Sequence, residues 1–174
     1  MSSSFVARRF VAGDADAMRS LAASVVAPVL VAGDLVILTG DLGAGKTTFT
    51  QGLGAALGVR GPIASPTFII ARTHPSLVEG SALVHVDAYR LGSLAELDDL
   101  DLDAALEDSV TVVEWGDTAV ALSDDRLHVT ISRARGGAFD LEAADGGDRV
   151  VTLEGHGARW AGVEFGDLDG GGDE

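Results

Sequence analysis

The chain has 174 residues, of which 47% are hydrophobic, and this length and composition predict one globular domain with a substantial core. It contains no cysteine, which excludes disulfides, thiolate metal sites and a cysteine nucleophile. The formal net charge of −15 argues against an autonomous nucleic-acid binder, because binding a phosphate backbone requires clustered basic side chains, and acidic residues outnumber basic ones 27 to 12.

The amino-terminal part of the chain predicts a strand followed by a helix. Phe5 to Val11 alternates in the manner of an edge strand, and Asp14 is a fair N-cap for a helix that runs to about Val31. The most apolar stretch, Leu21 to Ala32, is too short to span a bilayer. We interpret it as an amphipathic helix packed on a sheet rather than as a secretion signal, because Asp14 and Asp16 weaken the basic region that such a signal requires.

The only lysine of the chain lies in its most informative motif. Residues 40–48 read Gly-Asp-Leu-Gly-Ala-Gly-Lys-Thr-Thr, a complete G-x-x-x-x-G-K-[ST] phosphate-binding loop. Its glycines let successive backbone N–H groups surround phosphates, Lys46 brings a positive charge to the β and γ oxygens, and the Thr47 hydroxyl is a ligand for Mg²⁺. The sequence therefore predicts nucleotide-binding residues at Asp41, Leu42, Gly43, Ala44, Gly45, Lys46, Thr47 and Thr48.

The neighbouring segments support this motif. Asp34 to Thr39 reads as a short buried strand, and the helix that opens at Lys46 has apolar residues at i, i+4 and i+8 and a C-terminal cap at Gly58. A strand, a glycine loop and a helix N-terminus together form an anion site. A tight turn without a ligand is the alternative, but such a turn does not need Lys and Thr at these positions.

Two later apolar strands end in acids, at Asp87 after Ser81 to Val86 and at Glu114 after Val110 to Val113. In a sheet with a parallel core, ligands bind at the carboxyl ends of the strands, so either acid could meet Mg²⁺ beside the phosphate loop. The alternative for each is a carboxylate that caps a loop in water. His85 alternates with apolar residues, and we interpret it as a hydrogen-bonded core histidine rather than a catalytic one.

Two further residues are candidates for the site. Thr67, in Ser65-Pro66-Thr67-Phe68, is either a switch threonine that meets the metal or γ-phosphate, or part of a proline turn that enters a strand at Thr67 to Thr73. Trp115 either stacks on a base or a partner, or belongs to the core.

The rest of the chain completes the predicted architecture. Leu94 to Asp108 is acidic and helical, and 126–133 and 138–143 alternate as antiparallel strands that Gly136-Gly137 could join. The order of elements predicts an α/β, P-loop NTPase fold: a mixed sheet with a parallel core and an antiparallel extension, flanked by helices. Residues 1–154 form the single predicted domain, and 155–174 a disordered tail rich in Gly and Asp.

The class of nucleotide follows from residues that the chain lacks. A GTPase reads guanine with a second lysine motif, which is impossible when Lys46 is the only lysine, so adenine is the expected base. Water would be activated by a carboxylate, for which Glu114 is the best candidate. A small-molecule or nucleoside kinase is the alternative, with Arg126, Arg133 and Arg135 as the only cluster for a basic lid, and a binding module without turnover is a third hypothesis.

The segments GDLGAGKTTF, SPTF, HVDAYR and VVEW, in this order and spacing, closely resemble the TsaE (YjeE) family. The resemblance runs from about Phe5 to Leu141. These are small bacterial ATPases required to make N6-threonylcarbamoyladenosine beside the anticodon of ANN-decoding tRNAs.

The resemblance implies a role for each matched residue. ATP and its metal would be held by Gly43, Gly45, Lys46, Thr47 and Thr48. Asp87 would be the Walker B-like magnesium carboxylate, Glu114 would act on metal or water, and Thr67 would be the switch threonine, while Trp115 would serve the active site or the partner interface. It implies cytoplasmic partners that resemble TsaD and TsaB, whose assembly ATP hydrolysis would reset, and tRNA would be handled by those partners.

Overall fold

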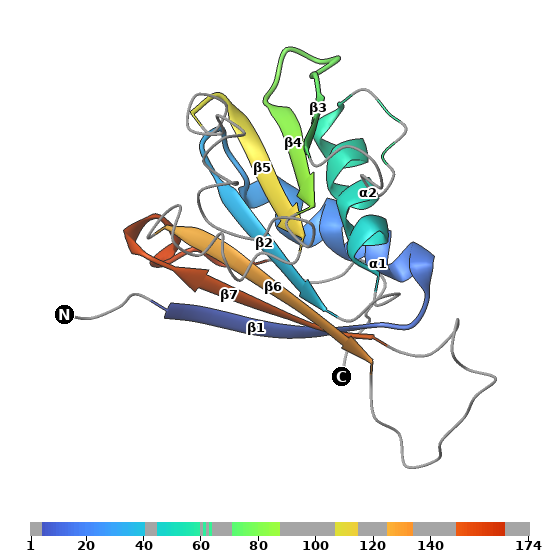
Figure 1. The fold of residues 1–174 in the computed structure, drawn as a ribbon. Helices are drawn as coiled ribbons and strands as arrows, with labels where there is room; N and C mark the ends of the chain where they lie inside the picture. The colour runs from blue at the N-terminus through green and yellow to red at the C-terminus, as the bar shows by residue number, and fades with distance from the viewer. Residues whose placement is uncertain are drawn as a thin grey trace.

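The computed structural model describes residues 5–40, 45–59, 61, 63, 71–87, 107–114, 125–133 and 149–165. In this part of the chain, seven strands form one sheet in the order β1-β7-β6-β2-β5-β4-β3, with helices packed against it (Figure 1). The strands are β1 (Phe5–Ala12), β2 (Leu35–Gly40), β3 (Ala71–His74), β4 (Ala82–Asp87), β5 (Ser109–Glu114), β6 (Arg126–Arg133) and β7 (Arg149–His156).

The middle of the sheet is parallel and both sides are antiparallel. β2 pairs in parallel with β5 and β6, and β5 pairs in parallel with β4. β7 pairs antiparallel with both β6 and β1, and β3 pairs antiparallel with β4. The predicted mixed sheet, with β1 as an edge strand, is therefore confirmed. Because β2, β4, β5 and β6 run in one direction, their carboxyl ends meet at one edge of the sheet, where ligands bind in open α/β sheets.

The first helix begins where the sequence predicts but changes its winding. Asp14 caps α1 (Ala15–Leu21) by accepting a hydrogen bond from the backbone N–H of Ala17 at 2.7 Å. The segment then continues as a π turn (Ala22–Val26) and a 3₁₀ turn (Ala27–Val29) instead of one α-helix to Val31. Pro28 has no N–H to donate to the preceding turn, which accounts for the irregular end.

Helix α2 (Lys46–Leu57) follows the phosphate-loop motif and covers the parallel strands. It ends at Gly58, whose φ of +72° is the left-handed conformation of a helix C-cap, as predicted. Phe49 and Leu53 are fully buried, one turn apart. A Cβ at Gly52 would lie 2.4 Å from the carbonyl oxygen of Arg19, so this glycine permits the close packing of α1 against α2. The strand residues of this core are Phe10, Ala12, Val36, Leu38, Leu83, Val110, Val112, Leu127, Val129, Ile131, Val151 and Leu153.

The antiparallel partner of β6 differs from the predicted one. β7 flanks β6 along its whole length and β2 occupies its other edge from Leu127 to Ile131, so β6 is paired on both sides. Residues 138–143, the predicted partner, lie outside the described residues. The sequence did not predict β7 because Gly155 contributes no side chain to its buried face and Val150 places an apolar side chain on its partly exposed face.

The folded domain also continues past the predicted boundary at residue 154. Trp160 is fully buried and Phe165 nearly so, and their rings stack with centroids 6.2 Å apart. A Cβ at Gly155 would lie 2.7 Å from the Cβ of Trp160, so Gly155 makes room for this side chain rather than beginning a tail. Of the predicted tail, residues 166–174 lie outside the described residues.

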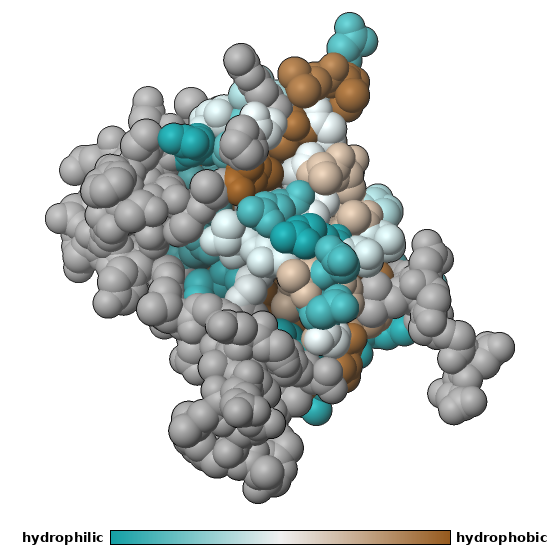
Figure 2. Space-filling view, turned by 90° about the vertical axis from the view of Figure 1, so that its right-hand side faces the viewer, coloured by the Kyte–Doolittle hydropathy of each residue, from teal (hydrophilic) through white to brown (hydrophobic). Residues whose placement is uncertain are grey.

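The loop between β3 and β4 presents apolar side chains on a fixed backbone. Leu77 and Val78 are 68% and 65% exposed, and Figure 2 shows hydrophobic residues gathered at the top of the molecule, where Figure 1 places this loop. The Ser76 hydroxyl accepts hydrogen bonds from Val78 and Gly80 N–H groups at 3.1 and 2.8 Å, and Leu77 N–H donates to the Gly58 carbonyl at 2.8 Å. These bonds attach the loop to the end of α2.

Of the other predicted elements, the strand placed at 67–73 is described from Ala71 as β3, and 64–70 lie outside the described residues. The acidic helix at 94–108 is described only at its last two residues, which form a turn.

Candidate nucleotide and metal site

The site is built where β2 gives way to α2. β2 ends at Gly40, and α2 begins after Gly45, whose φ of +114° is a conformation that L side chains rarely adopt. No described side chain caps the N-terminus of α2, and the first N–H groups of any helix lack partners within the helix. The helix start therefore offers N–H donors and the positive end of its dipole to an anion.

Six of the predicted site residues lie outside the described residues. They are Asp41, Leu42, Gly43 and Ala44 in the phosphate loop, together with Thr67 and Trp115. Their predicted roles remain predictions.

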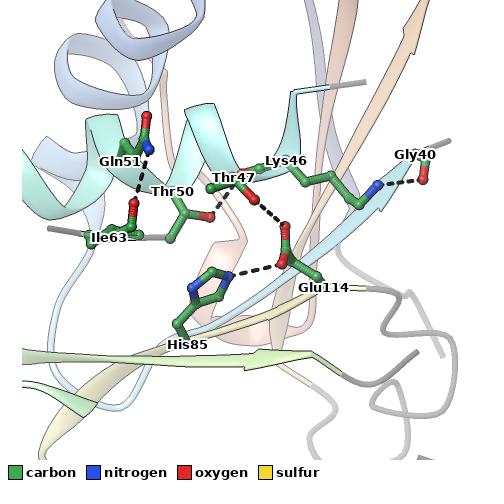
Figure 3. Close-up of polar contacts among 8 residues, drawn as sticks. All are labelled: Gly40, Lys46, Thr47, Thr50, Gln51, Ile63, His85 and Glu114. Atoms are coloured by element: carbon green, nitrogen blue, oxygen red, sulfur yellow. Dashed lines mark hydrogen bonds and ion pairs between the residues drawn. The ribbon is translucent and has the colours of Figure 1, made fainter. Parts of the chain in front are cut away.

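Lys46 lies at the first position of α2 and its side chain is directed back to the end of β2. Its Nζ donates a hydrogen bond to the Gly40 carbonyl oxygen at 2.8 Å, although only 6% of the residue is exposed (Figure 3). The Thr50 hydroxyl donates to the Lys46 carbonyl at 2.9 Å, which binds the first turn together. The positive charge of Lys46 is thereby held between the end of β2 and the start of α2.

Glu114, the last residue of β5, lies in front of the first turn of α2. It is 3% exposed, and its two carboxylate oxygens have different partners (Figure 3). The Thr47 hydroxyl donates to Oε1 at 3.4 Å, and His85 Nε2 lies 3.1 Å from Oε2. The structure thus brings together Lys46, Thr47 and Glu114 from the predicted set.

Asp87 and Glu114 end neighbouring parallel strands at the same level. They are direct register partners in the β4–β5 pair, so the two acids that the sequence placed at strand ends share one edge of the sheet. The side chain of Asp87 lies outside the described part of the structure, and its role as a metal ligand remains a prediction.

The described donors fit a magnesium–nucleotide complex. A threonine hydroxyl and a carboxylate are the oxygen ligands that Mg²⁺ prefers, and this ion is usually held by one or two carboxylates plus substrate phosphates. Among the described residues, no group of three or more His, Cys, Asp or Glu side chains is placed to hold a metal ion. Thr47 and Glu114 are therefore the described residues that could contact a metal carried by the nucleotide.

His85 and Gln51 belong to the surroundings of the site, although the sequence suggested no role in it for either. His85 is fully buried, as predicted for a core histidine, but its partner is the carboxylate of Glu114. Gln51, one turn after Thr47, donates from Nε2 to the Ile63 carbonyl at 2.9 Å and so ties α2 to the segment that leads to Thr67. The available signal for His85 was its alternation with Leu83, which places both on one face of the strand.

The fold and these contacts define an α/β protein in which a polar site joins the first turn of a helix to the carboxyl ends of parallel strands. The family model described as Threonylcarbamoyl adenosine biosynthesis protein TsaE matches residues 12–138, more than half of the chain. The chain belongs to the TsaE family.

Individual relatives agree with this assignment. The tRNA threonylcarbamoyladenosine biosynthesis protein TsaE of Streptomyces coelicolor is 56% identical over 147 residues, which cover 83% of this chain and 95% of the relative. Its Bacillus subtilis counterpart is 38% identical over 123 residues, covering 70% and 75% of the two chains. The crystal structure of Bacillus subtilis YdiB is similar with a TM-score of 0.66 at 28% identity, covering 92% of this chain and 91% of YdiB.

No helix in the described ranges combines the length and the apolar character that a membrane crossing requires.

Proposed function

We propose that this protein binds and hydrolyses ATP as a component of the machinery that makes N6-threonylcarbamoyladenosine next to the anticodon of ANN-decoding tRNAs. The observation that carries the proposal is the contact of Thr47, at the start of α2, with the buried carboxylate of Glu114. The names of the relatives support the tRNA part of the proposal.

In this proposal the residues of the loop and of the strand ends have different roles in binding the phosphates and the metal ion. The backbone of residues 41–45 and the start of α2 bind the phosphates, while Lys46 places its charge on the β and γ oxygens. Bound Mg²⁺ would supply further neutralisation of the phosphate charge. Thr47 and Asp87 would hold that ion, and Thr67 would respond to the γ-phosphate.

Glu114 is the proposed group that activates water. Its carboxylate is nearly dry and faces the helix start, and a carboxylate in hydrogen-bond reach of water can accept its proton as the water attacks. With Lys46 as the only lysine, the chain lacks the second lysine of guanine-reading motifs, which supports adenine as the base.

The proposed partners are proteins that resemble TsaD and TsaB. The net charge of −15 disfavours direct binding of tRNA, so tRNA would be handled by the partners while ATP hydrolysis resets their assembly. Trp115 is the proposed contact at the nucleotide or the partner interface. We place this activity in the cytoplasm, where ATP and tRNA occur together.

The partner part of the proposal is tested by capture of the full chain with cognate TsaB and TsaD. We expect capture that differs between ATP-containing and nucleotide-free buffer, and ATP hydrolysis that rises in the complex. The matched control is Lys46→Ala, which should lose the effect of nucleotide. No capture in either condition, together with no stimulation of hydrolysis, would contradict the partner assignment.

The kinase alternative requires a basic lid close to the site. Arg126 and Arg133, two members of its predicted basic cluster, stand at opposite ends of β6, and Arg126 is at the end remote from the site because β6 runs parallel to β2. Phosphate release from ATP without any added acceptor separates the two hypotheses. We expect such release; a phosphorylated acceptor as the only product would favour the kinase.

A further inference from the structure

His85 is an unusual residue for the core of this sheet. It is fully buried on β4, opposite Val112 of β5, and its Nε2 lies 3.1 Å from Oε2 of Glu114 (Figure 3). Its other ring nitrogen, Nδ1, is buried without a hydrogen-bond partner among the described residues. A buried polar atom without a partner destabilises the fold, so an apolar side chain would serve the core better than histidine does.

The contact with Glu114 indicates a role for this histidine. An ionised carboxylate can only accept hydrogen bonds, so His85 must carry its hydrogen on Nε2 and donate it to Oε2. This bond fixes one oxygen of the carboxylate. The other oxygen, Oε1, is thereby directed toward the Thr47 hydroxyl, which lies 3.4 Å away at the start of α2.

We propose that His85 is a positioning residue for Glu114 in the hydrolysis of ATP. This inference rests on the proposed function. His85, on β4, donates to Glu114 at the end of β5. This bond selects the rotamer of Glu114 in which Oε1 faces the start of α2, where the attacking water is expected. Groups that orient a functional side chain in this way matter because a site tolerates little angular error.

Two amides separate this role from a general need for a polar group at residue 85. In His85→Gln the amide nitrogen can reach the position of Nε2 and donate to Glu114, whereas in His85→Asn it reaches only the position of Nδ1. Both variants bury one neutral amide. A matched control is Thr111→Val on β5, which removes a buried hydroxyl without a described partner on the face of the sheet opposite to Glu114.

The experiment measures single-turnover phosphate release, affinity for a fluorescent ATP analogue and thermal unfolding for the full chain and the three variants. We expect His85→Asn to slow hydrolysis about 10–100-fold, the usual loss for an orienting residue, while nucleotide affinity changes less than about threefold. His85→Gln should recover most of the rate, and Thr111→Val should retain all of it. Equal rates for the Gln and Asn variants, or rates that follow the unfolding temperature, would overturn the proposal.

A second readout does not depend on activity. The chain has only 4 histidines, so NMR of ¹³C,¹⁵N-labelled, nucleotide-free protein can identify the ring nitrogen of His85 that carries the hydrogen, with assignment by through-bond correlation of the ring with the backbone of residue 85. We expect the hydrogen on Nε2; a hydrogen on Nδ1 alone would overturn the proposal even if the variants fail to fold. If wild-type and Lys46→Ala proteins release phosphate equally slowly, the proposed function itself fails, and the NMR result then shows whether the His85–Glu114 geometry stands.

Discussion

A buried acid lies beside each end of strand β2, but the two acids have different partners. At the start of the strand, Asp34 is 5% exposed and forms a two-pronged ion pair with Arg159, whose Nε and Nη2 each donate to one of its oxygens at 2.9 Å. The backbone N–H of Val31 also donates to Asp34, at 2.8 Å. This carboxylate is neutralised and fully hydrogen-bonded by the protein itself.

At the other end of β2, Glu114 is equally buried but its described partners are a hydroxyl and an imidazole. The 3.4 Å contact with Thr47 is long for an O–H···O hydrogen bond, so a ligand can replace it at little cost. The comparison teaches that a buried acid with its own guanidinium serves the fold, whereas one whose second oxygen makes only a long contact with a hydroxyl retains capacity for a ligand.

The largest effect on stability is expected at the structural end. Trp160 is fully buried, and the Arg159 guanidinium lies 4.4 Å from its ring centroid. Trp160→Ala should lower the free energy of unfolding by about 3–5 kcal/mol, because it removes a large core side chain. Urea unfolding measures this, with Trp160→Phe as the milder control since the indole N–H has no described partner. A loss under about 1 kcal/mol would mean that residues 157–165 are not part of the core.

The next largest effect is expected at the functional end. Lys46→Ala should slow ATP hydrolysis about 100–1000-fold, the usual cost of removing one preorganised electrostatic group. Phosphate release and nucleotide affinity are the measurements. Arg9→Ala is the control, because it removes the same charge from an exposed position on β1. If both variants lose the same activity, the effect is one of net charge, and the assignment of the nucleotide site to the end of β2 is wrong.

A smaller effect is expected for the ion pair itself. A fully buried pair costs about 3–5 kcal/mol when one partner is removed; the Arg159 side chain is 26% exposed, so we expect about 2 kcal/mol of lost stability for Arg159→Leu. Unfolding of Arg159→Leu, Asp34→Asn and the double variant forms a thermodynamic cycle. Additive losses would show that the pair is not coupled, while turnover per folded molecule should stay unchanged.

The smallest effect is expected away from both ends of β2. Leu77→Ser, on the exposed loop between β3 and β4, should change the free energy of unfolding by less than about 0.5 kcal/mol, because the side chain is already in water. Thermal unfolding of the isolated chain is the measurement. A larger loss would show that this loop contributes to the core.

The sequence predicts one of these two ends far better than the other. The loop motif, the helix from Lys46 and the acid-ended strands are local patterns, so β2, α2, β4 and β5 could be placed from spacing alone. The Asp34–Arg159 pair joins residues 125 positions apart, and neither residue carries a motif. The carboxy-terminal segment was not predicted because its composition suggests disorder, while its structure depends on the buried rings of Trp160 and Phe165 and on the ion pair of Arg159.

At the site, the sequence identified the chemical groups but not their contacts. Glu114 and Thr47 were predicted from their positions beside the strand end and the loop. The bond between His85 and Glu114 depends on the register of β4 against β5, which only the assembled sheet defines.

The most direct test of the central claim is single-turnover hydrolysis of ATP by Glu114→Gln, with binding of nucleotide measured on the same preparation. The account predicts that the variant binds ATP but releases phosphate about 100–10,000-fold more slowly, as expected when a general base loses its charge. Full turnover by Glu114→Gln would contradict the assignment of Glu114 as the group that activates water.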